Sequence, residues 1–126
     1  MPPKTIPLIS DTRRAQAGLV LAVEVVVIDL LSKWAVFTFV LNDAVTKTIT
    51  PFFNLVIVWN RGVTFGLLGD VTIQHQAYIL SGVGLLVVVA LGVWLFKTSS
   101  ALQALALGLV MGGALGNIYD RIIYGA

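Results

Sequence analysis

Three ionisable residues, Glu24, Asp29 and Lys33, interrupt a long apolar stretch near the N-terminus. Each such group costs about 2.5–3.5 kcal/mol at membrane depth on insertion scales, so it is a functional candidate by default. Asp29 and Lys33 are four residues apart, so on a helix they share a face and can pair. Two interpretations stay open: an ion pair that lowers its own burial cost near an interface, and a polar anchor for a site at the outer surface. Glu24 points elsewhere and receives no role.

A second polar group, near the C-terminus, contains Gly113, Asn117, Asp120 and Arg121. Steps of three and four residues place these positions on one side of a helix and its exit. Asn117 can form hydrogen bonds across helices, and the adjacent Asp120 and Arg121 point apart. The simpler alternative to a functional site is that these residues are polar only because the helix ends at the level of the lipid headgroups.

A third candidate, Asn60-Arg61-Gly62, follows a run rich in β-branched and aromatic residues. Glycine at this point permits a positive φ or the close approach of a ligand to the backbone. An ordinary hairpin turn explains the same residues. The single histidine, His75, is expected in an exposed loop.

The composition indicates the class of protein that must hold these groups. The chain has 126 residues, 58% hydrophobic and 11% charged, with mean hydropathy +0.96. So little charge argues against a soluble enzyme, and so much apolar content excludes disorder. The absence of cysteine and the single histidine exclude disulfides, thiolate metal sites and multi-histidine sites. The few scattered cations exclude a nucleic-acid footprint.

The hydropathy pattern predicts a single membrane domain over 1–126, an all-α transmembrane bundle with a small extracytoplasmic β-structure. About 20 apolar residues cross a bilayer core, and the uncharged stretches satisfy that length. Gly108, Gly112 and Gly116 recur every four residues and predict close helix packing. The expected segments are a loop-like cytoplasmic segment 1–17, helix 18–41, an extracytoplasmic strand-like loop 42–76 with its turn at Arg61-Gly62, helices 77–96 and 101–118, and an outer loop beginning at 119–126.

The Lys/Arg distribution favours a cytoplasmic N-terminus. The outer end of the first helix then carries Asp29 and Lys33, and the outer end of the third carries Asn117, Asp120 and Arg121. We therefore predict that the two polar groups converge at an extracytoplasmic site at the membrane surface.

Three motifs together resemble the signal peptidase II (lipoprotein signal peptidase) family. Asp29-Leu-Leu-Ser-Lys33 resembles its D-x-x-x-K pattern, Asn60 to Phe65 its N-x-G-x-x-F pattern, and Gly112 to Arg121 its G-G-A-x-G-N-x-x-D-R pattern. The order and separations of the three motifs also match, from about residue 18 to the last residue.

The resemblance implies an aspartic endopeptidase of the bacterial inner membrane, with four helices, no metal and no cofactor. Its substrate would be a prolipoprotein with a lipidated cysteine, and its other partners membrane lipids; we expect a monomer. Two aspartates would share one proton, one activating water and the other polarising the carbonyl. In the family the first follows the D-R pair and the second opens the fourth helix, so we expect both after Ala126 and expect residues 1–126 alone to be inactive.

Carried over residue by residue, the resemblance assigns seven positions to substrate binding or to shaping the site, and none to catalysis: Asp29, Lys33, Asn60, Gly62, Gly113, Asn117 and Arg121. Two alternatives stay open. One is a non-catalytic relative that binds lipoprotein precursors. The other is a small membrane transporter subunit, which would leave the third motif unexplained.

Overall fold

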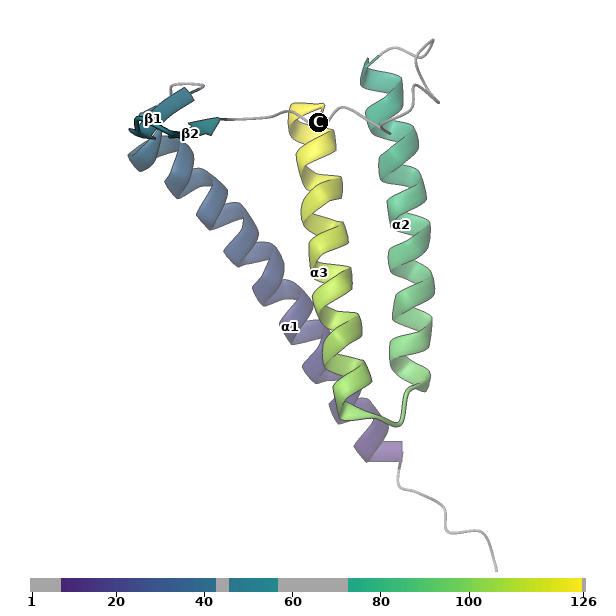
Figure 1. The fold of residues 1–126 in the computed structure, drawn as a ribbon. Coiled ribbons are helices and arrows are strands. Elements are labelled where there is room, and N and C mark those ends of the chain that lie inside the picture. The colour runs from purple at the N-terminus through teal and green to yellow at the C-terminus, as the bar shows by residue number, and fades with distance from the viewer. Residues whose placement is uncertain (1–7, 43–45, 57–72, 126) are drawn as a thin grey trace, which may run out of the picture.

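The computed structural model describes residues 8–42, 46–56 and 73–125. Three long helices dominate, and α3 lies between α1 and α2 (Figure 1). A small hairpin lies beside the end of α1, at the same end of the bundle as the end of α3 and the start of α2 (Figure 1). In chain order the elements are α1 (Leu8–Ala35), the π-helical turn η1 (Val36–Val40), β1 (Thr46–Thr50), β2 (Phe53–Val56), α2 (Ile73–Lys97) and α3 (Ala101–Tyr124).

The all-α membrane class predicted from composition is confirmed. His75–Lys97 and Ala101–Tyr124 are each long and apolar enough to cross a membrane. Much of their apolar surface faces outward; Leu86 and Leu102, for example, are 71% and 78% exposed. Water would make such exposure costly, whereas lipid would not. The role of α1, which carries Glu24, Asp29 and Lys33, as a further span stays a prediction.

The helix ends differ from the expected ones. The segment 1–17 was expected to be loop-like, but α1 begins at Leu8, directly after Pro7. The prolines precede the helix and therefore do not break it. Helix α2 begins at Ile73, inside the expected loop 42–76.

The last helix also runs further than expected. The sequence predicts an outer loop that begins at 119–126, but α3 continues to Tyr124. No glycine or proline lies between Ile118 and Gly125, so the helix continues. Gly125 takes the left-handed conformation (φ 75°) and donates its N–H to the Arg121 carbonyl. At the other end, Ser100 caps α3 by accepting a hydrogen bond from the Gln103 N–H.

Glycine allows α1 and α3 to pack with their backbones close together. A methyl group added to Gly112 would lie 2.6 Å from Val25 Cβ and 2.7 Å from the Ala22 carbonyl oxygen. One added to Gly108 would overlap the Gly18 backbone. The predicted strip of small residues on the last helix is therefore confirmed as the face that packs on α1.

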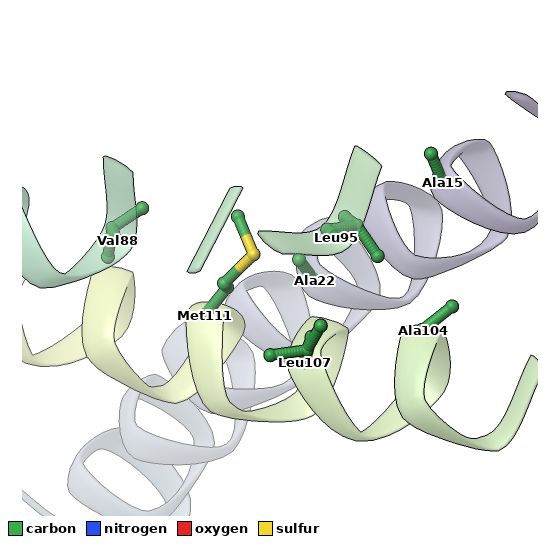
Figure 2. Packing of buried hydrophobic residues seen from close by; sticks show 7 residues of the cluster. All are labelled: Ala15, Ala22, Val88, Leu95, Ala104, Leu107 and Met111. Atoms are coloured by element: carbon green, nitrogen blue, oxygen red, sulfur yellow. The ribbon is translucent and has the colours of Figure 1, made fainter. Parts of the chain in front are cut away.

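The buried core is thin and runs along the lines of contact between the three helices (Figure 2). Leu95 of α2 is fully buried, and Met111 of α3 is 5% exposed. The small and medium-sized side chains of this cluster fill the space that the close backbones leave. Its buried members are Ala15, Ala22, Val88, Leu95, Ala104, Leu107 and Met111.

The expected β-structure is present as an antiparallel hairpin of β1 and β2. Thr46 pairs with Val56, Thr48 with Asn54, and the register shifts between Thr48 and Thr50. The β2 residues belong to the run rich in β-branched and aromatic residues, whereas β1 lies outside that run although its Thr and Ile are good strand formers. The tight connection falls at Pro51-Phe52. The turn expected at Arg61-Gly62 lies outside the described residues.

Candidate functional site

The first and last helices are joined by one lysine between two aspartates. Lys33 Nζ lies 2.7 Å from Asp29 Oδ2 on its own helix, and it also contacts Asp120 Oδ2 on α3. Asp29 and Lys33 share a face because they are four residues apart. We call these three residues the Lys33 bridge. It confirms that the two polar groups predicted from the sequence converge at one end of the bundle.

The helix packing explains why Lys33 reaches Asp120. Gly116 lies one turn before Asp120, and a methyl group on it would lie 2.5 Å from Asp29 Oδ2. The Asp29 carboxylate therefore fits against α3 only because position 116 has no side chain. One turn further along both helices, Lys33 and Asp120 meet.

The bridge is partly shielded from solvent. The side chains of Lys33 and Asp29 are 47% and 32% exposed, whereas that of Asp120 is 18% exposed. Ser32 adds a hydrogen bond from its hydroxyl to the Asp29 carbonyl, 3.0 Å. The Lys33 bridge holds two carboxylates around one ammonium, and Arg121 adds a second cation in the same last turn of α3.

Arg121 faces a different neighbour from Asp120. It is three residues after Ile118, so the two share a face. Ile118 contacts α2, because a methyl group on Gly84 would lie 3.1 Å from Ile118 Cγ1. At about 100° per residue, Arg121 lies about 60° from Ile118 and about 40° from the exposed Asn117, so it points between the α2 side and the exposed side of α3. Asp120 is directed toward α1. This divergence agrees with the expectation that the two adjacent charges do not neutralise each other.

The other predicted site residues lie in different places. Gly113 and Asn117 are on α3 but exposed, and a methyl group on Gly113 would meet nothing within 4 Å. Neither is drawn into the Lys33 bridge. Asn60 and Gly62 lie outside the described residues. Gly113, Asn117, Asp120 and Arg121 all belong to the second half of α3, and Asp120 joins this group to α1 through its ion pair with Lys33.

Sequence reasoning missed two features of this end of the bundle. It treated Gly116 only as part of a packing strip, although this residue makes room for the Asp29 carboxylate. It also gave no role to Ser81 on α2, which is 6% exposed and whose hydroxyl has no hydrogen-bond partner in the described part of the chain. A lone serine in an apolar span was the only available signal.

The charges present favour ion-pair chemistry over proton transfer. An aspartic dyad needs two carboxyl groups that share one proton. Lys33 lies between Asp29 and Asp120, which is the arrangement of a salt bridge. Within residues 8–42, 46–56 and 73–125, no three His, Cys, Asp or Glu side chains gather to hold a metal ion. The described charges can therefore hold the ends of α1 and α3 together.

Comparison with known proteins identifies the family. The family model described as signal peptidase (SPase) II matches residues 21–126. Three similar curated proteins are all named lipoprotein signal peptidase. That of Methylobacterium sp. (strain 4-46) is 47% identical over 78 residues, which are 62% of this chain and 47% of the relative. That of Nitrobacter hamburgensis is 37% identical over 112 residues, 88% of this chain and 68% of the relative. That of Caulobacter vibrioides is 35% identical over 122 residues, 95% of this chain and 71% of the relative.

The chain thus spans between 47% and 71% of the length of these relatives. No solved structure is significantly similar to it. The family model covers most of the chain and includes the residues of the Lys33 bridge and Arg121. On this evidence the chain belongs to the signal peptidase II family of bacterial membrane proteins.

Proposed function

We propose that this chain forms the substrate-positioning part of an aspartic endopeptidase that removes signal peptides from diacylglyceryl-modified prolipoproteins. The site would lie at the extracytoplasmic surface of the inner membrane, where water can reach the scissile bond. Membrane lipids would surround the monomeric bundle. The substrate, already anchored by its acyl chains, would approach from the bilayer.

The observation that carries this proposal is the convergence of two separate motifs at one end of an apolar bundle. Asp29 and Lys33 come from α1, and Asp120 comes from the D-R pair of α3. These residues are conspicuous because charged groups at membrane depth need partners or a function. The ion pair supplies partners, and the adjacent Arg121 supplies a cation for the substrate backbone.

The Lys33 bridge gives the site its geometry. By joining the ends of α1 and α3, it fixes the position of the last turn of α3, which carries Arg121. We propose that Asp29 and Lys33 shape the site, and that Asn60, Gly62, Gly113, Asn117 and Arg121 contact substrate or the catalytic segment. The catalytic aspartates would be others than Asp29 and Asp120, so we expect residues 1–126 alone to leave the precursor uncut.

The test is cleavage of a diacylglyceryl prolipoprotein by the product of the complete reading frame, reconstituted in lipid. Arg121→Gln should reduce cleavage strongly at unchanged protein level. Lys97→Gln is the matched control, because Lys97 is an exposed cation in the last turn of α2, at the other end of the bundle. Absence of cleavage by the wild-type product, with binding of the precursor retained, would favour the non-catalytic precursor-binding alternative.

A further inference from the structure

Helices α1 and α3 touch closely at one end of their contact and diverge toward the end that carries the hairpin (Figure 1). At Gly108 an added methyl group would overlap the backbone of Gly18, so the two backbones are in contact. At Gly112, one turn further along α3, it would still lie 2.7 Å from a backbone oxygen of α1. At Gly116 the nearest atoms all belong to the Asp29 side chain, whose Cβ lies 3.8 Å away. The contact therefore changes from backbone against backbone to backbone against a side-chain tip.

Burial follows the same gradient along α1. Where the structure describes the side chains of α1, the buried residues all lie in the first half of the helix: Ala15, Gly18 and Ala22. Helix α2 differs, because Ala77 and Ser81 are 4% and 6% exposed at its hairpin end. There a methyl group on Gly84 would lie 3.1 Å from Ile118 of α3. Helices α2 and α3 thus form a pair that is packed at both ends, whereas α1 is packed firmly at one end.

Lys33 links α1 to α3 where the two helices are furthest apart. Its ammonium contacts Asp120 of α3 and lies 2.7 Å from Asp29 of its own helix. If the end of α1 moved away from α3, Asp29 would move with Lys33, so the ammonium would keep one carboxylate. This matters because a charge without a partner is costly at membrane depth. Partly exposed ion pairs contribute little to stability, so the contact with Asp120 can break and re-form.

We propose that the hairpin end of α1 swings away from the α2–α3 pair about the contact between Gly18 and Gly108, and that the Lys33–Asp120 ion pair is the latch that holds it closed. A firmly packed pair and a helix that is fixed at one end are the parts of a hinge. The inference rests on the proposed function in one respect: the lipidated precursor would pass between the separated ends of α1 and α3.

The helical rise gives the size of the movement. Lys33 is 15 residues beyond Gly18, a distance of about 22 Å along α1. A swing of about 10–15° about Gly18 would therefore move the end of α1 by about 4–6 Å. Such a displacement exceeds the reach of an ion pair, so the latch is either closed or broken.

The test measures the distance between two spin labels in the complete reading-frame product, reconstituted in lipid without precursor. The labels are attached to cysteines introduced by Leu31→Cys in α1 and Ile122→Cys in α3, which are 58% and 54% exposed. Asp120→Ala should lengthen this distance by about 4–6 Å, the movement worked out from the helical rise. A control pair at Ile79 of α2 and Ile122 should keep its distance and so report that each variant is folded.

Two further variants separate the latch from a general effect of lost charge. Asp29→Asn leaves the ion pair between the helices in place, so it should leave the Leu31–Ile122 distance unchanged. Exchange of the charges by Lys33→Asp together with Asp120→Lys again places one ammonium between two carboxylates. The double variant should restore the wild-type distance, whereas Asp120→Lys alone should lengthen it.

An unchanged Leu31–Ile122 distance in Asp120→Ala, with the control pair at its wild-type distance, would overturn the latch. Failure of the exchanged charges to restore the distance would also overturn it. An uncleavable lipidated precursor peptide should lengthen the wild-type distance. If the wild type cuts the precursor but this peptide leaves the distance unchanged, passage between α1 and α3 is refuted. If the wild type does not cut the precursor while Asp120→Ala lengthens the distance, the proposed function fails and the latch stands.

Discussion

The same added methyl group should lower the stability of the protein at one of two adjacent glycines on α3 and raise it at the other. At Gly112 the new carbon would lie 2.6 Å from Val25 Cβ and 2.7 Å from the Ala22 carbonyl oxygen. At Gly113 it would meet nothing within 4 Å. Both residues are inside the same helix, so the intrinsic gain from replacing glycine by alanine is the same.

That intrinsic gain is about 1 kcal/mol in a helix interior. At Gly113 nothing opposes it, so Gly113→Ala should stabilise the protein by about 0.5–1 kcal/mol. At Gly112 the obstructing atoms are a backbone oxygen and a Cβ, which no rotamer change can move. Overpacking of this kind costs about 1–3 kcal/mol, and here the upper part of that range applies. Gly112→Ala should therefore destabilise the protein by about 1–2 kcal/mol.

The assay is unfolding of the two variants and the wild type in mixed micelles with increasing sodium dodecyl sulfate, followed by helix content. The unfolding midpoints of the two variants should fall on opposite sides of the wild-type midpoint. Equal midpoints for Gly112→Ala and Gly113→Ala would refute the packing of α1 on α3 through this face. If Gly113 also contacts substrate, Gly113→Ala should lower cleavage without lowering stability.

Three further changes address the bridge and the helix ends. Lys33→Met leaves Asp29 and Asp120 without their shared cation, whereas Asp120→Asn keeps the Lys33–Asp29 pair. Lys33→Met should therefore lower the melting temperature more than Asp120→Asn. The reverse order of melting temperatures would exclude the bridge. Gly116→Ala should displace the Asp29 carboxylate, whose side-chain tip can move aside. It should therefore reduce the rate of precursor cleavage while changing the free energy of unfolding little. A loss of unfolding free energy as large as that of Gly112→Ala would contradict this. Ser100→Ala removes the cap of α3 and should cost about 1 kcal/mol in the same unfolding assay, and an unchanged midpoint would show that the cap contributes nothing.

Local patterns in the sequence predicted much of this protein. Apolar content and low charge predicted the membrane class, and α2 and α3 have the length and composition of spans. The spacing of Asp29 and Lys33 predicted a pair, because residues four apart on a helix are neighbours whatever surrounds them. Helix ends were less predictable: α1 begins earlier and α3 ends later than expected, since tertiary contacts and a left-handed Gly125 decide where a helix stops.

Which residues share a helix face could thus be predicted from the chain, because the helical period is the same whatever surrounds the helix. The contact between Lys33 and Asp120, which are 87 positions apart, depends on how α1 and α3 pack. The axial register of α1 against α3 is set by the glycines of α3, each of which leaves space for a particular group of α1. Gly116 makes room for Asp29, and that contact brings the two helix ends together.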